Sequence, residues 1–149
     1  MTLSIFHNKD YVLNKDLEKM LHNAFSLISD LENINEFSLN LKLVTDDEME
    51  QLNLKFREIK KTTNVLSFKN EDISKERTKS LGDIAINYEY VLRESKWLEK
   101  TFEDHMIHMM VHGVLHILGY DHNNSETADL MENREIFVLN QLNIDNPYK

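Results

Sequence analysis

The sequence contains no cysteine among its 149 residues. Disulfide bonds and thiolate metal sites are therefore excluded, and any metal ion must be held by histidines and carboxylates. Long apolar runs are also missing, because the longest, residues 106–118, is interrupted by three histidines and a glycine and is too short to span a bilayer. No basic segment followed by an apolar one opens the chain. We therefore expect a cytoplasmic protein with no membrane partner.

Basic residues are scarce, since 17 Lys+Arg against 26 Asp+Glu give a net charge of −9. This balance argues against a nucleic-acid partner. The window from Lys55 to Lys79 is the exception, with eight basic and four acidic residues and a local charge of +4. The window is either a solvated loop of mixed charge or a phosphate-facing patch on an acidic body. Charge alone does not decide between the two.

The composition, 41% apolar and 29% charged, is typical of one globular domain covering residues 1–149. Apolar periodicity, capping residues and turn signals predict its elements. Strands are expected at Leu3–Phe6, Phe37–Leu43, Asn64–Phe68 and Leu81–Asn87, helices at Leu13–Leu31 (N-cap Asn14), Thr45–Phe56, Tyr88–Trp97, Phe102–Leu118 and Ser125–Leu142, and a polar loop at Lys69–Ser80. This order predicts an α+β layered fold with a small, mostly parallel sheet of about four strands.

The segment from Phe102 to Leu118 carries apolar residues on nearly every helical face and contains no proline. A helix that is apolar all round is a buried central helix. Gly119 is placed to end it, as the residue after the C-cap. Five of the seven histidines lie on or just after this helix, at positions 105, 108, 112, 116 and 122.

His112 and His116 are four residues apart, so their rings share one helical face. A turn at Gly119 can bring His122 back as a third metal ligand, and three nitrogens leave a fourth position open for water. This spacing equals that of the metzincin metalloproteases, but those enzymes have a glutamate base where this chain has Gly113. We expect His108 to lie outside the ligand set and His105 to be structural.

Residues 112–122, HGVLHILGYDH, closely resemble the H-G-x-L-H-L-x-G-Y-D-H signature of the YbeY family. Two further regions match that family: LNLKFR at 52–57 with TNVLSF at 63–68, and LGDI at 81–84. The resemblance extends over residues 52–142. Thr62 and Lys69 stand where the family usually has proline, and Glu58 stands where it usually has glycine.

The resemblance implies a metal-dependent endoribonuclease that acts on single-stranded ribosomal RNA, in maturation of the 3′ end of 16S rRNA and in ribosome quality control. It also implies one Zn²⁺ per chain at His112, His116 and His122, with His112 and Arg57 catalytic. A guanidinium fork suits phosphate oxygens, which agrees with a phosphate-facing Arg57. The ribosome and proteins associated with it are the expected partners.

Two other functions are compatible with the sequence. A metal-dependent peptidase or amidohydrolase is favoured by the ligand spacing and disfavoured by Gly113. A non-enzymatic ribosome assembly factor with structural zinc is the other alternative. The general base is unassigned, with Asp121 and Glu126 as candidates. Asp121 could instead orient His122, and Asp83 either shapes the site or caps a turn.

Overall fold

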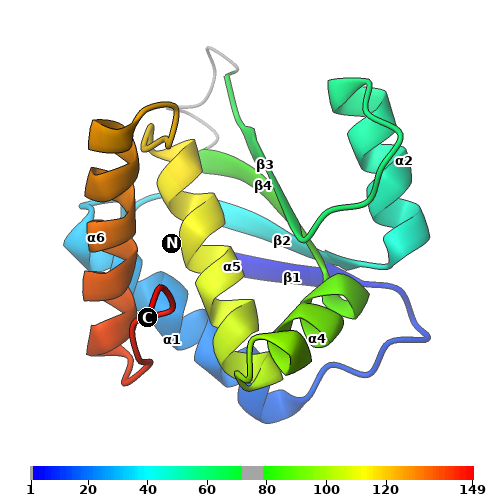
Figure 1. Cartoon of the computed structure of the whole chain (residues 1–149), viewed down its shortest axis with the longest axis horizontal. Helices are drawn as coiled ribbons and strands as arrows, with labels where there is room; N and C mark the ends of the chain where they lie inside the picture. Colours follow the sequence, from blue (N-terminus) through cyan, green and yellow to red (C-terminus); the bar gives the residue numbers. More distant parts are fainter. Residues whose placement is uncertain (1, 72–78) are drawn as a thin grey trace.

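The computed structural model describes residues 2–71 and 79–149, which build a four-stranded sheet with the strand order β1-β2-β4-β3 (Figure 1). The strands are β1 (Leu3–His7), β2 (Ser38–Val44), β3 (Val65–Lys69) and β4 (Ser80–Asn87). Strands β1, β2 and β4 are parallel, whereas β3 lies at one edge and pairs antiparallel with β4. The predicted small and mostly parallel sheet is therefore confirmed.

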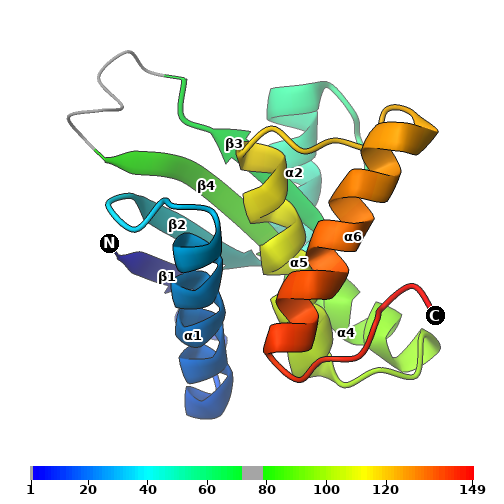
Figure 2. The same ribbon diagram turned by 90° about the vertical axis from the view of Figure 1, so that its left-hand side faces the viewer.

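Helices cover both faces of this sheet. They are α1 (Lys15–Leu31), α2 (Asp46–Arg57), α4 (Tyr88–Trp97), α5 (Phe102–Ile117) and α6 (Ser125–Gln141). The larger apolar core lies between the sheet and α1, α4, α5 and α6, and Figure 2 shows α5 between α1 and α6. A smaller core lies under α2 on the opposite face. Ile84 and Ile86 of β4 face the larger core and Ala85 faces the smaller one, so β4 is buried on both sides.

Two helix starts follow directly from side chains that the sequence analysis singled out. The side-chain oxygen of Asn14 accepts hydrogen bonds from the backbone N–H groups of Asp16 and Leu17 at the start of α1. Thr45 and Glu48 form the predicted capping box of α2. Each cap satisfies N–H groups that have no partner within the helix, an effect worth about 1 kcal/mol.

The buried central helix is also confirmed. Eleven of the 16 residues of α5 are buried, including His105 and His108. The helix ends at the C-cap Leu118, and Gly119 follows in a left-handed conformation with φ of +104°. The Tyr120 backbone N–H then donates to the Leu115 carbonyl oxygen at 3.0 Å. This turn reverses the chain and directs the segment that carries His122 back along α5.

The predicted loop between the last two strands is shorter than the sequence suggested. Lys69 pairs with Gly82 as the last residue of β3, and Ser80 is the first residue of β4. Both residues are polar and were expected in the loop, but their backbones belong to the sheet. Residues 72–78 of the expected loop lie outside the described residues. No helix within the described ranges has the length and apolar character needed to cross a membrane.

Candidate metal centre

Three histidines meet at the C-terminal end of α5. His112 and His116 lie on its last two turns, and His122 lies in the segment after Gly119. The Nε2 atoms of His112 and His116 are 3.0 Å apart, and one nitrogen from each of the three rings lies within 4.8 Å of the others. Nitrogens bound to one tetrahedral zinc ion at about 2.0–2.1 Å are roughly 3.3 Å apart. The cluster can therefore hold a metal ion.

The hydrogen bonds of two rings fix which nitrogen faces the cluster. Nδ1–H of His116 donates to the Tyr120 carbonyl oxygen at 3.1 Å, and Nδ1–H of His112 donates to Glu135 Oε1 at 2.9 Å. A carbonyl oxygen and a carboxylate can only accept, so both Nδ1 atoms carry the proton. In the neutral form of both rings, the two Nε2 lone pairs are therefore directed at the same space, as in two imidazoles that bind one cation.

The surroundings of His116 keep its ring neutral. Burial lowers the pKa of His116, and the neighbouring His112 and His122 lower it further. A neutral imidazole is the form that binds a metal ion. The lowered pKa of His116 therefore favours the form of this ring that can bind a cation.

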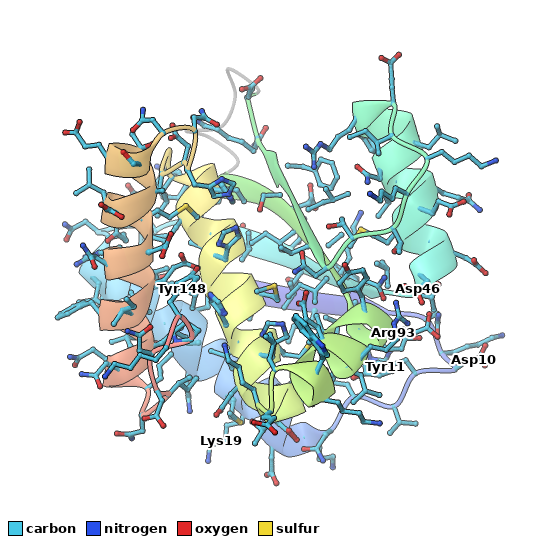
Figure 3. All side chains as sticks on the ribbon, in the orientation of Figure 1. Asp10, Tyr11, Lys19, Asp46, Arg93 and Tyr148 are labelled. Atoms are coloured by element: carbon cyan, nitrogen blue, oxygen red, sulfur yellow. The ribbon has the colours of Figure 1, made fainter. Side chains whose placement is uncertain are left out.

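Glu135, a fully buried carboxylate of α6, holds His112 in place. Besides the bond to His112, Glu135 accepts hydrogen bonds from Nε2–H of His108 at 2.9 Å and from the Tyr148 hydroxyl at 2.9 Å. Burial alone would raise the pKa of Glu135, but the bonds from the two histidines outweigh it and lower the pKa to about 2. Figure 3 shows Tyr148 beside α5 and α6, where it closes this network.

Glu135 was not among the residues expected from the sequence, although the chain carries a signal for it. Met131, Glu135 and Leu139 are spaced four residues apart in α6, and all three are buried. An acidic residue inside an apolar helical stripe needs a partner, and the histidines of α5 were the available ones. His105, which was expected to be structural, hydrogen-bonds Glu94 of α4 at 2.6 Å instead of joining the cluster.

A cleft of about 730 Å³ opens over the three histidines. Its other walls are Phe56 and Arg57 at the end of α2 and residues 63–68, which include most of β3. No carboxylate occurs among the described residues that line it. Arg57 is exposed and forms no ion pair with a carboxylate of residues 2–71 or 79–149. The predicted ligands and the predicted phosphate-binding arginine thus share one open cleft on an acidic protein.

The model of one protein family, Endoribonuclease YbeY, matches residues 4–143. The chain is 37% identical over 153 residues to Endoribonuclease YbeY of Francisella philomiragia, covering 99% of this chain and 95% of that protein. It is 39% identical over 138 residues to the protein of the same name from Francisella tularensis subsp. novicida, covering 88% and 83%.

The chain belongs to the endoribonuclease YbeY family. The fold is also similar to a solution structure of TM1509 from Thermotoga maritima, with a TM-score of 0.61 and 25% identity over 95% of this chain and 91% of that one. Endoribonucleases are hydrolases that cleave phosphodiester bonds within RNA. The resemblance seen in the histidine motif therefore extends over nearly the whole chain.

Close packing accounts for the glycine between the first two histidines of the YbeY motif. A Cβ atom at Gly113 would lie 2.9 Å from Ile84 Cδ1 and 3.0 Å from Ser67 Oγ. The Ser67 hydroxyl donates to the Gly113 carbonyl oxygen at 3.0 Å, which ties α5 directly to β3. The glutamate that a zinc protease has at this position would not fit here without moving the helix away from the sheet.

Two of the three departures from the YbeY pattern, Glu58 and Thr62, lie directly after α2, and the third, Lys69, is the last residue of β3. Glu58 is the C-cap of α2 with φ of +59°, a left-handed conformation that glycine adopts most easily. The Thr62 hydroxyl donates to Asp46 Oδ1 at 3.3 Å and accepts from Asn87 Nδ2 at 2.9 Å. Arg93 holds the same Asp46 through two hydrogen bonds, and Figure 3 labels this pair. Thr62 therefore fixes the loop after α2 through hydrogen bonds, whereas a proline at this position would stiffen the loop through its ring.

Three other candidates from the sequence are not among the residues that line the cleft. Asp83 is in the middle of β4, opposite Phe68 of β3, so it caps no turn. Asp121 Oδ1 accepts from the Asn123 backbone N–H at 3.2 Å and does not line the cleft. Glu126 is exposed in the first turn of α6 and is also absent from the lining. Neither carboxylate is therefore among the side chains that line the cleft.

Proposed function

We propose that residues 1–149 form a single zinc-dependent endoribonuclease domain that cuts single-stranded RNA. His112, His116 and His122 hold one zinc ion, and Arg57 binds the phosphate that is cleaved. The observation that carries the proposal is the convergence of three imidazoles in a cleft whose lining, among the described residues, includes an arginine and no carboxylate. An open cleft suits a catalytic site, whereas structural zinc sites are closed.

The donor set fits zinc, because three imidazole nitrogens with no thiolate suit it and leave one position open. A zinc ion bound there supplies Lewis-acid activation of water near neutral pH. Glu135 and the Tyr120 carbonyl oxygen orient the rings of His112 and His116 through their Nδ1–H groups. Arg57 presents a guanidinium fork to two phosphate oxygens and stabilises the charge that develops on them.

We propose that the polymer is ribosomal RNA, at the 3′ end of 16S rRNA, and that the chain acts on the ribosome in the cytoplasm. The support for this finer statement is the chain's match to the YbeY family over residues 4–143. A peptidase is disfavoured, because Gly113 replaces the usual base and has no room for a larger side chain. A ribosome assembly factor with structural zinc is disfavoured by the open cleft.

Metal content and RNA cleavage, measured on the same preparations, test the assignment of roles. We expect one zinc per chain in the wild type, loss of zinc in His116→Ala, and retention in His22→Ala, which changes an exposed histidine of α1. Arg57→Lys keeps the charge but loses the bidentate fork, so cleavage of single-stranded RNA should fall sharply while zinc content stays. Equal zinc in both histidine variants would contradict the ligand set, and full activity of Arg57→Ala would contradict the role of Arg57.

A further inference from the structure

An exposed aromatic ring stands at the edge of the metal cleft. Phe56 lies in the last turn of α2, directly before Arg57, and is 56% exposed. It lines the same cleft as the three histidines. A phenylalanine left this open contributes little to the core, so burial does not account for its position.

The ring of Phe56 is supported from the sheet. The ring centroids of Phe56 and Phe68 are 5.0 Å apart with planes tilted by 56°. Phe68 lies on β3 and packs against the smaller apolar core between the sheet and α2. The Phe68 ring is thus anchored in the core and supports the Phe56 ring at the cleft. Phe56 keeps more than half of its surface exposed.

One lysine contacts this ring, and further basic residues follow closely in the sequence. Lys55 Nζ lies 5.2 Å from the centroid of the Phe56 ring, and Lys60 and Lys61 are exposed on the segment that follows α2. Arg57 is the next residue along the chain. An exposed aromatic ring among cations is the combination by which proteins bind single-stranded nucleic acid, with bases stacked on the ring and phosphates held by the charges.

We infer that Phe56 stacks a nucleobase of the RNA next to the phosphate held by Arg57, an inference that rests on the proposed endoribonuclease function. The Lys55 ammonium leaves the ring when the base arrives and contacts a neighbouring phosphate, because its long side chain is exposed and free to move. Bases in a duplex are already stacked and paired, so they cannot use the Phe56 ring. Phe56 is therefore the residue that selects single strands.

Binding of short RNAs to metal-loaded protein tests this inference, by fluorescence anisotropy under conditions in which cleavage is blocked by a non-hydrolysable backbone. Phe56→Leu keeps an apolar side chain and loses the stacking ring, so the Kd for a single strand should rise about tenfold, while the Kd for a duplex stays the same. Phe56→Tyr keeps the ring and should bind as the wild type does. Leu54→Ala is the matched control, because Leu54 is 46% exposed on the same helix but does not line the cleft.

Base identity gives a second readout that a merely structural role of Phe56 would not produce. Adenine stacks more strongly than uracil, so the wild type should bind oligoadenylate more tightly than oligouridylate, and Phe56→Leu should lose that preference. Unchanged single-strand binding in Phe56→Leu, or an equal loss in Leu54→Ala, would overturn the inference. A wild-type protein that neither binds nor cleaves RNA would instead overturn the proposed function.

Discussion

Replacing Glu135 with glutamine removes one charge from the network that orients His112 and leaves its shape intact. The amide oxygen can still accept from the Nδ1–H of His112 and the Nε2–H of His108, and the amide N–H₂ can donate to the Tyr148 hydroxyl. Hydrogen bonds to a charged group contribute about 1.5–3 kcal/mol and neutral ones about 0.5–1.5 kcal/mol, so each histidine loses about 1 kcal/mol of stabilisation. The variant should therefore fold and hold its metal less tightly.

Mutation of a residue that hydrogen-bonds to a metal ligand typically lowers the metal affinity 10–100-fold. Because the bond from His112 to the fully buried Glu135 is 2.9 Å long, we expect a loss of about 1.4–2.7 kcal/mol in zinc binding. Competitive titration against a chromophoric chelator measures it. Glu126→Gln, on the exposed first turn of the same helix, is the control and should bind zinc as the wild type does. A folded Glu135→Gln whose Kd for zinc stays within about twofold of the wild type would refute the role given to Glu135.

Three further variants test packing, backbone strain and charge. Gly113→Ala forces a methyl group against the buried Ile84 at a packing cost of about 1–3 kcal/mol, and alanine recovers about 1 kcal/mol as the better helix former. The free energy of unfolding in urea should therefore fall by up to about 2 kcal/mol, whereas a variant more stable than the wild type would contradict the close packing. Glu58→Gly relieves a left-handed residue at a helix C-cap and should stabilise the protein by about 0.5–1 kcal/mol, and a loss of stability would show that the position carries no strain. Charge reversal at Lys60 and Lys61 should weaken RNA binding for all sequences alike and make its salt dependence shallower, and unchanged binding would make these lysines ordinary surface residues.

Most of the fold could be predicted from the sequence, because local signals and tertiary structure agree. The helix that begins after Asn14 and the capping box at Thr45 both occur where the sequence indicates. The strand order could not be predicted, because sheet order depends on packing between distant segments. For the same reason the sequence placed Lys69 in a loop, whereas its backbone pairs with that of Gly82 in the sheet.

At the candidate site, sequence spacing identified the residues that the structure brings together. His112 and His116 are four apart on a helix, and a glycine turn returns His122, so the meeting of these rings follows from helix geometry. Glu135 comes from a separate helix, and only the folded structure shows that it lies behind His112. Why position 113 is glycine also depends on the distance between α5 and the sheet, which no sequence pattern gives.

The most direct test of the account compares metal-loaded wild type with His116→Ala on two substrates, single-stranded RNA and casein. His116 contributes one of the two nitrogens that face each other at 3.0 Å, so its loss should abolish the metal site without removing any core side chain. We expect the wild type to cleave the RNA and leave casein intact, and His116→Ala to cleave neither. Cleavage of RNA by His116→Ala at the wild-type rate, or cleavage of casein by the wild type, would contradict a metal-dependent endoribonuclease.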